Sequence, residues 1–415
     1  MRDLSVDLLR TNPSFRAYWL GQSVAGAGHQ VTVLALPLVS AVTLGAGPAA
    51  VGAVATAATL PYLLFSLVLG HVLEGNNQKK VMIPADLVQA CLLLLIPISW
   101  VSGWLSVPLL VVIAFLTGTA AVAFGISGFS YLPTLVEHRQ LPAANRAIQG
   151  TRTITEIGGP GMAGLLLGWF VPPLVLFIDA LGYLASAAGI SRSRPLNRAP
   201  SRAPTSTGQP NLLTGMVILF TNPYLRALTI HAALFNLAEQ IFLLNLIIWA
   251  VQQQGVPAVA YGLALSAAGI GGLVGTITAL RLADRFGLGK AFAVSLVLSC
   301  GAPILAGIWP HQGIMLAVVI GLVMFTIGIG QGNANVYSLS LRQTVIPKDQ
   351  LSRSAGAYTQ LMYGTIPIGA ALAGLIGATI SVRAGIIIGA SAMLLSALPM
   401  LTRRLITLRT LEAAM

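Results

Sequence analysis

The chain has 415 residues, of which 56% are hydrophobic and only 8% are charged, and its mean hydropathy is +0.83. A soluble domain carries about 25% charged residues, so this composition excludes a globular protein whose whole surface faces water. The net charge of +12 would suggest nucleic-acid binding in a soluble protein, but the positions of the basic residues indicate membrane topology instead.

A membrane-spanning helix needs about 20 mostly apolar residues, and twelve runs of this kind follow one another along the chain. The first six lie near residues 15–42, 48–73, 81–101, 105–130, 147–170 and 172–190. The second six lie near residues 215–252, 257–282, 291–309, 313–340, 354–380 and 384–402. The first and seventh runs are long, and we interpret residues 11–16 and 221–226 as interfacial lead-in segments. The prediction is an all-α membrane protein with twelve transmembrane helices.

A polar stretch rich in proline, serine and arginine separates the two sets of runs and predicts an extended linker. The expected domains are therefore an N-terminal six-helix bundle over residues 1–190, a cytoplasmic linker over 191–214 and a C-terminal six-helix bundle over 215–415. Cytoplasmic loops of membrane proteins are enriched in lysine and arginine. With a cytoplasmic N-terminus, Arg383 alone of the 23 basic residues falls on the outside. We expect a multi-pass protein of the bacterial inner membrane with both termini in the cytoplasm.

The two halves repeat each other at a constant offset of 210 residues. Thr11-Asn12-Pro13 recurs as Thr221-Asn222-Pro223, and the same shift without gaps superposes Gln30 on Gln240 and His29 on Glu239. Self-similarity of this length indicates a duplicated six-helix unit. Because each copy has an even number of spans, the copies share one orientation about an axis along the membrane normal, with a polar path expected at their seam.

Several segments resemble the major facilitator superfamily, in particular its bacterial macrolide-efflux and siderophore-exporter branch. The resemblance rests on Phe15-Arg16 with Trp19-Leu20-Gly21-Gln22-Ser23, on Ala85-Asp86-Leu87-Val88-Gln89-Ala90, on Tyr131-Leu132-Pro133 with Asn145, and on Asp179-Ala180-Leu181. It covers nearly the whole chain. It implies a two-bundle transporter fold, a transporter rather than an enzyme, and transport by alternating access.

The superfamily's signature loop, G-x-x-x-D-R-x-G-R-K/R, resembles two loops of this chain. The first copy keeps Gly70, Glu74 and the Lys79-Lys80 pair, with Gly75 in place of the arginine, and the second keeps Asp284-Arg285 with Gly287. The resemblance implies a cytoplasmic gate formed by Glu74, Lys79, Lys80, Asp284 and Arg285. The alternative is a helix-ending turn whose charges set topology.

The fifth run contains Gly159-Pro160 with Gly164, which resembles the antiporter motif of exporters. Proline breaks one backbone hydrogen bond, and glycine permits close packing or a bend. The motif favours export, and the alternative is a tight helix crossing. The fourth run carries no basic residue between Ala114 and Phe129, so proton coupling through the arginine that the family often places there is not expected.

Ionisable side chains inside a span are costly and therefore functional candidates. His29 and Glu239 lie near the middle of the first and seventh runs and form a candidate proton-binding pair, because histidine titrates near neutrality and burial favours the protonated carboxyl group. The alternative is a structural polar clamp. Glu156, one turn beyond Arg152, is either a cavity carboxylate or half of an i, i+4 ion pair.

Polar residues in the first, seventh and tenth runs complete the candidate substrate and proton pathway. They are Gln30, Asn236, Gln240, Gln331, Asn333 and Asn335. Asp86 and Asp179 lie in runs that pack peripherally in the resembled fold, where structural hydrogen bonding is the interpretation. No G-x-x-x-x-G-K-[ST] motif or Cys/His metal motif occurs in the sequence.

These observations predict a proton-coupled exporter of small amphipathic molecules such as an antibiotic, a drug or a siderophore-like metabolite. The proton is the expected coupling ion, with no cofactor and no metal. The expected partners are the substrate and membrane lipid, not nucleic acid, and the expected state is a monomer. Two alternatives remain, a lipid or lysolipid flippase of the same fold and a non-transporting membrane sensor or scaffold.

Overall fold

The computed structural model describes residues 4–73, 77–196, 212–308, 312–347 and 350–409. All regular elements in these ranges are helices, and no strand occurs among them. The chain divides into two compact units, the first made of residues 1–46 and 53–203 and the second of residues 47–52 and 204–415. The expected linker falls largely on residues 197–211, which lie outside the described residues.

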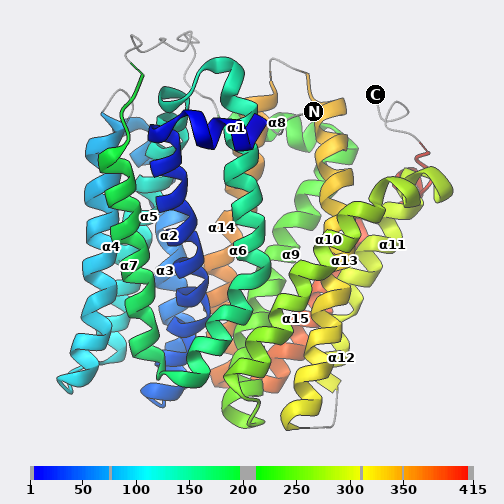
Figure 1. The fold of residues 1–415 in the computed structure, drawn as a ribbon. Helices are drawn as coiled ribbons and strands as arrows, with labels where there is room; N and C mark the ends of the chain where they lie inside the picture. The colour runs from blue at the N-terminus through cyan, green and yellow to red at the C-terminus, as the bar shows by residue number, and fades with distance from the viewer. Residues whose placement is uncertain (1–3, 74–76, 197–211, 309–311, 348–349, 410–415) are drawn as a thin grey trace. The chain divides into compact units, whose positions relative to one another are not determined.

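The first unit contains six long helices that run side by side, and a short helix, α1, that lies across the end of α2 (Figure 1). Its elements are α1 (Leu4–Thr11), α2 (Pro13–Leu38) with the π-helical turn η1 (Val39–Thr43), α3 (Pro48–Val72), α4 (Gln78–Val101), α5 (Val107–Leu135), the 3₁₀ turn η2 (His138–Gln140), α6 (Leu141–Trp169) and α7 (Pro172–Arg192). Only the first residues of α3, 48–52, group with the second unit.

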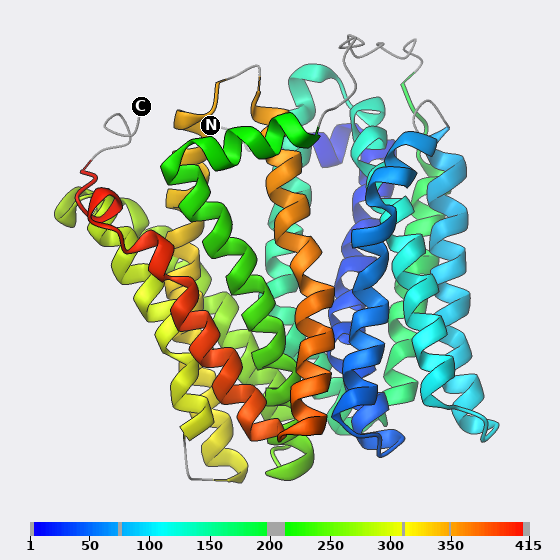
Figure 2. The same cartoon turned by 180° about the vertical axis from the view of Figure 1, so that it is seen from behind.

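The second unit has the same plan, with the short helix α8 lying across the end of α9 (Figure 2). Its elements are α8 (Leu212–Thr221), α9 (Pro223–Ile247) with the π-helical turn η3 (Ile248–Gln253), α10 (Ala258–Phe286), α11 (Leu288–Gly301), α12 (Pro303–Ile308), α13 (Gly313–Val345), α14 (Leu351–Thr379), α15 (Val382–Ser396), the 3₁₀ turn η4 (Leu398–Met400) and α16 (Arg403–Ile406).

Eleven helices in the described part of the chain are long and apolar enough to cross a membrane. The remaining long helix, α6, has 29 residues, which is ample for a span. It is less apolar because it carries Arg146, Arg152 and Glu156. The prediction of an all-α, multi-pass membrane protein with twelve long helices is therefore confirmed.

The lead-in segments lie earlier than predicted. The helical backbone is interrupted at Asn12 and at Asn222, between a short helix and the long helix that follows. Residues 11–16 and 221–226 therefore include the start of a long helix instead of preceding it. Asn12 caps α2 by accepting a hydrogen bond from the Phe15 amide at 2.9 Å, and Asn222 caps α9 in the same way through the Tyr224 amide at 2.9 Å. A proline follows each asparagine, at the position where a missing N–H costs least. This local chemistry fixes the helix start and makes our placement of the lead-in wrong.

The offset of 210 residues is visible in the backbone of the two units. Corresponding helices begin at Gln78 and Leu288, at Leu141 and Leu351, and at Pro172 and Val382. Four of the five glycines with positive φ in the described residues also correspond, since Gly45 (φ 59°) matches Gly255 (φ 65°) and Gly103 (φ 77°) matches Gly313 (φ 60°). The sequence repeat is therefore a structural repeat.

The same offset holds for helix packing. In the first unit Gly159 of α6 lies against the side chain of Gln30 on α2, where an added Cβ would come within 2.5 Å of the Gln30 Cβ. In the second unit Gly369 of α14 lies against Gln240 of α9, where an added Cβ would come within 2.9 Å of the Gln240 Cβ. Each unit thus has the same glycine–glutamine contact.

Two buried carboxyl groups lie inside the first unit. Asp86 on α4 is 1% exposed and Asp179 on α7 is fully buried. The Thr32 hydroxyl of α2 donates a hydrogen bond to Asp179, and Ser186 of α7 interacts with Asp86 while accepting a hydrogen bond of 2.7 Å from Gln22. Buried polar groups without partners are costly, so these bonds support the structural interpretation of both aspartates.

We expect Thr32→Val to lower the free energy of unfolding by about 1–3 kcal/mol, because the valine leaves the buried Asp179 carboxyl group without this donor. Thr59→Val is the matched control, since the Thr59 hydroxyl donates only to backbone carbonyls of its own helix. Equilibrium unfolding in mixed detergent micelles measures both. An equal loss in the two variants would show that the Thr32–Asp179 bond contributes nothing.

Candidate functional site

A pocket of about 210 Å³ lies inside the second unit, between helices α9, α11, α13 and α14. Its polar lining residues are His231, Asn236, Glu239, Ser299, Gln331, Asn335, Ser338 and Tyr358. Phe235, Phe292, Leu296 and Met362 are among the apolar ones. The pocket is therefore amphipathic, with a single carboxyl group among its lining side chains.

Helix α9 supplies one face of the pocket through helical spacing. Leu228, His231, Phe235 and Glu239 follow one another at intervals of three or four residues, which places them on one side of a helix. The opposite wall comes from α13, where Gln331, Asn335 and Ser338 repeat the same spacing. Helix α9 thus presents a mixed polar and apolar face to the cavity, and α13 presents a polar stripe opposite it.

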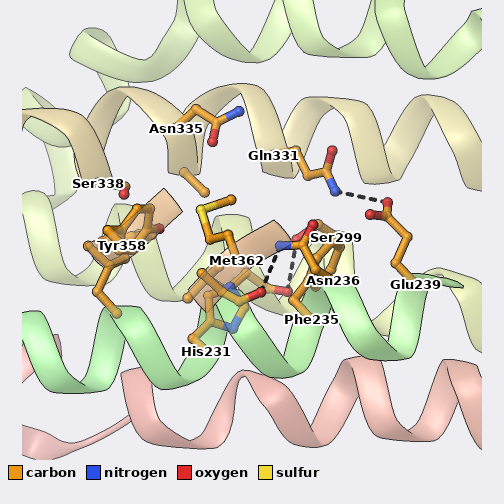
Figure 3. Close-up of a pocket in the computed structure, with 15 residues that line it drawn as sticks. His231, Phe235, Asn236, Glu239, Ser299, Gln331, Asn335, Ser338, Tyr358 and Met362 are labelled. Carbon is orange, nitrogen blue, oxygen red and sulfur yellow. Dashed lines mark hydrogen bonds between the residues drawn. The ribbon is translucent and has the colours of Figure 1, made fainter. Parts of the chain in front are cut away.

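Glu239 and Gln331 point toward one another from α9 and α13 (Figure 3). The Gln331 amide nitrogen donates a hydrogen bond of 3.3 Å to the Glu239 carboxylate. Among the described residues, no basic side chain forms an ion pair with Glu239. Because the donor is neutral, the Glu239 carboxyl group can gain or lose a proton without breaking a salt bridge. When the group is ionised, no charge on Gln331 neutralises it.

His231 and Asn236 lie beside this pair and are held by backbone groups. The His231 Nδ1 atom lies 2.8 Å from the Ser396 carbonyl oxygen of α15, and the imidazole ring tilts against Phe235 at a centroid distance of 5.8 Å. The Asn236 amide donates to the Ala232 carbonyl at 2.7 Å. These bonds orient both side chains, so this part of the pocket is preformed.

The Arg342 side chain lies beside the end of the pocket that Tyr358 and Ser338 form. The Arg342 guanidinium carbon is 4.0 Å from the centroid of the Tyr358 ring, and the Arg342 Nε atom donates to the Ser338 carbonyl oxygen at 3.4 Å. A guanidinium over an aromatic face is a stabilising contact. It holds the Tyr358 ring in place as one wall of the cavity.

The sequence matches the Major Facilitator Superfamily over residues 18–367. The chain belongs to this superfamily.

Relatives and solved structures agree with that assignment. The multidrug efflux pump Tap of Mycolicibacterium fortuitum is 25% identical, covering 84% of this chain and 86% of the pump. Macrolide efflux protein A of Streptococcus pyogenes is 26% identical over 53% of this chain and 55% of its own length. The crystal structure of the nucleoside transporter NupG has a TM-score of 0.73 at 15% identity and covers 93% of this chain and 98% of that one. The predicted family and the twelve-helix major facilitator fold are confirmed, and the protein is a transporter.

The structure brings Asn236, Glu239, Gln331 and Asn335 of the predicted pathway to the pocket. Two other predicted residues of the second unit lie elsewhere. Asn333 is 1% exposed and faces α10, where the Thr278 hydroxyl donates to it at 3.4 Å. Gln240 lies against Gly369 of α14. Asn333 and Gln240 therefore pack against neighbouring helices outside the pocket, because a helix presents residues one or two positions apart to different sides.

His29, Gln30 and Glu156 belong to the first unit. His29 is exposed, with its Nδ1 atom 3.5 Å from the Tyr183 hydroxyl. Glu156 forms an ion pair of 2.8 Å with Arg152, and both side chains are at least half exposed. For Glu156 the structure therefore contains the i, i+4 ion pair with Arg152 that was one of its two interpretations. The pairing of His29 with Glu239 stays a prediction.

The predicted gate residues lie at helix ends. Lys79 donates to the carbonyl oxygens of Ser191 at 2.6 Å and Ser193 at 2.9 Å, and so caps the end of α7. Lys80, Asp284 and Arg285 are exposed, and the Arg285 guanidinium lies 5.4 Å from the centroid of the Phe286 ring. Glu74 lies outside the described residues. The gate function of all five stays a prediction.

The antiporter-like motif lies inside α6, with Gly159 and Gly164 buried and Pro160 partly exposed. Gly159 faces α2 through Gln30, so the motif contains the tight helix crossing that was the alternative. Its role in the direction of transport stays a prediction.

Several pocket residues escaped the sequence analysis. Phe235, Ser299 and Ser338, and Arg342 beside the pocket, were not singled out as site residues. Phe235 lies one helical turn from both His231 and Glu239, and this spacing is visible in the sequence. Ser299 was missed because a serine inside an apolar helix commonly bonds its own backbone, as Ser299 does with the Leu296 carbonyl at 3.3 Å. No cluster of three or more His, Cys, Asp or Glu side chains suited to a metal ion occurs in the described ranges.

Gln331→Leu and Asn333→Leu form a matched pair on α13. We expect Gln331→Leu to reduce transport about tenfold by removing the donor to Glu239, with little change in thermal stability. We expect Asn333→Leu to lower thermal stability with little change in transport, because Asn333 packs against α10 outside the pocket. Flux assays and thermal unfolding in detergent separate the two effects. Equal transport losses at normal stability would place both side chains in the pathway.

Proposed function

We propose that the protein is a proton-coupled exporter of small amphipathic molecules and that Glu239 is its proton-binding group. The observation that carries the proposal is the position of the Glu239 carboxyl group, which faces an amphipathic pocket, lies midway along a long helix and bonds a neutral amide. An ionisable group at that depth is expensive, and a packing role alone would not require one.

The pocket chemistry indicates the class of substrate. Phe235, Phe292 and Met362 offer aromatic and polarisable apolar surface, which adapts to ligands of different shape. Glu239 and the amides of Asn236 and Gln331 offer acceptors and donors at one side. This combination suits a drug-like molecule with a flat apolar part and a cationic or hydrogen-bonding part. The efflux activity in the names of two relatives supports the same class.

Proton coupling follows from competition for one carboxyl group. When Glu239 is ionised, it attracts the cationic part of a substrate and accepts the Gln331 hydrogen bond in its stronger, charge-assisted form. Protonation removes the charge and weakens both contacts. A pocket that opens to the two membrane faces in turn then releases substrate on the side where protons are abundant and carries a proton back.

The expected setting is the bacterial inner membrane with both termini in the cytoplasm. The placement of lysine and arginine in one set of connections supports this orientation. It makes the outside the more acidic side, as an exporter driven by proton entry requires. We propose a monomer as the transporting species, because the pocket is complete within one unit of one chain.

Transport by purified protein in liposomes tests the proposal. With an acidic lumen, we expect the liposomes to accumulate ethidium and erythromycin, and we expect nigericin, which collapses the pH gradient, to abolish that accumulation. Protein-free liposomes are the control. Accumulation that persists without a gradient would contradict proton coupling.

The two alternative functions predict other outcomes in the same preparation. A flippase would move fluorescently labelled phospholipid between leaflets without a pH gradient. A sensor or scaffold would transport neither the drugs nor the lipid. Either result, with no gradient-driven drug flux, would overturn the proposal.

A further inference from the structure

A second hollow, a groove of about 340 Å³, lies on the first unit between α2 and α7. These two helices lie side by side (Figure 1). Arg16, near the start of α2, and Arg192, in the last turn of α7, line one end of the groove. Leu20 and Val24 line its length and are 49% and 50% exposed.

Small residues form the floor of the groove. Gly189 of α7 packs against α2 so closely that an added Cβ would overlap the carbonyl oxygen of Ala17. Ala185 and Ala188 continue the same face of α7. Because these side chains are short while Leu20 and Val24 project, the helix pair encloses a channel that runs away from the two arginines. The result is an apolar track with a cationic end.

In the part of the chain that the structure describes, the two guanidinium groups of the groove pair with no acidic side chain. Among the described residues, neither Arg16 nor Arg192 forms an ion pair or a side-chain hydrogen bond, and no acidic side chain lines the groove. Lys79, not Arg192, satisfies the last carbonyl groups of α7. Two exposed cations from different helices therefore line one groove, and no acidic side chain of the described residues lines it with them.

We propose that this groove binds one anionic phospholipid, with its phosphate between Arg16 and Arg192 and an acyl chain along Leu20 and Val24. The positive charges of Arg16 and Arg192 favour an anionic headgroup, and the apolar track favours a ligand in which that headgroup carries an acyl chain. Both helices are long and apolar enough to cross a membrane. In that position the exposed apolar part of the groove would face acyl chains, and the arginines at the helix ends would lie at headgroup level. Basic pockets between membrane helices recognise acidic headgroups in this way.

Lipid titration followed by native mass spectrometry tests the site. Delipidated full-length protein in detergent is titrated with phosphatidylglycerol and, separately, with phosphatidylethanolamine. We expect preferential binding of one phosphatidylglycerol, and we expect Arg16→Ala with Arg192→Ala to weaken it about 30-fold, from a contribution of about 1 kcal/mol for each basic residue near the headgroup. Arg16→Lys with Arg192→Lys keeps the charges and is expected to bind within a few-fold of wild type.

The matched control is Arg10→Ala with Arg194→Ala, which removes the same charge from two exposed arginines of this unit that do not line the groove. Equal weakening by the control pair would reduce the site to general surface charge and overturn the proposal.

Ala188→Phe tests the apolar track, because it fills the groove and leaves both arginines in place. We expect it to weaken phosphatidylglycerol binding as strongly as loss of the arginines does. Unchanged binding in this variant, or displacement of the lipid by inorganic phosphate, would show that the site recognises phosphate alone and would contradict the lipid assignment. Undiminished binding in the double alanine variant would contradict the role of the arginines.

Discussion

Glu239→Gln is expected to reduce pH-gradient-driven accumulation of ethidium to the level of protein-free liposomes. The substitution keeps the size of the side chain and its place opposite Gln331, but it removes the group that binds and releases a proton. Exchange of labelled for unlabelled substrate needs no net proton movement. We therefore expect the variant to retain exchange while it loses accumulation.

Glu156→Gln is the control for this variant. It removes a carboxylate of the first unit that lies in an exposed ion pair with Arg152, and exposed pairs of this kind contribute only about 0.3–0.5 kcal/mol. We expect nearly normal accumulation. Loss of accumulation in Glu156→Gln with normal activity in Glu239→Gln would move proton coupling to the first unit and contradict the proposed role of Glu239.

Gly159→Leu and Gly369→Leu are expected to have the largest effects on folding. Both glycines lie where a side chain would collide with a neighbouring helix, Gly159 with Gln30 and Gly369 with Gln240 and the Leu237 carbonyl oxygen. Overpacking costs about 1–3 kcal/mol even for modest insertions, and a leucine adds four carbon atoms. We expect each variant to lose most of its folded yield, measured by size-exclusion chromatography and thermal unfolding in detergent.

Each of these variants has a control on its own helix. Gly158 on α6 and Gly356 on α14 have open space where a Cβ would stand, so Gly158→Leu and Gly356→Leu are expected to fold with near-normal yield. Similar losses at all four positions would show that glycine is needed for helix flexibility and not for close packing. Normal folding of Gly159→Leu would contradict the crossing geometry directly.

The sequence predicted the repeat and the helices well because both depend on local chemistry and on length. The 210-residue offset superposed Thr11-Asn12-Pro13 on Thr221-Asn222-Pro223 and Gln30 on Gln240 in the sequence. The structure then shows the same offset in the glycine–glutamine contacts and in the turns at Gly45 and Gly255. The prediction was less accurate at helix boundaries. There the cap formed by Asn12 determines where the helix begins, and the hydropathy of the surrounding run does not. Side-chain capping acts over two or three residues, and a window of about 20 residues averages it away.

The candidate site was predicted in part for a similar reason. A polar residue inside a span is visible in the sequence, so Asn236, Glu239 and Gln331 were found. The side of the helix on which it lies depends on packing between helices that are distant in the chain. Asn333 and Asn335 looked alike in the sequence, yet Asn333 packs against Thr278 of α10 while Asn335 lines the pocket. Phe235 was missed because phenylalanine is common wherever a helix is apolar, although its spacing from His231 and Glu239 places all three on one side of α9.

Proton release on substrate binding is the most direct test of the central claim that substrate and proton compete for Glu239. Detergent-purified protein in weakly buffered solution with a pH-sensitive dye is titrated with ethidium over a series of starting pH values. We predict that the wild-type protein releases protons as it binds, in a range of pH where Glu239 is protonated, and that Glu239→Gln binds without releasing any. Equal release by the two proteins, or binding by the wild type with no release at any pH, would contradict the account.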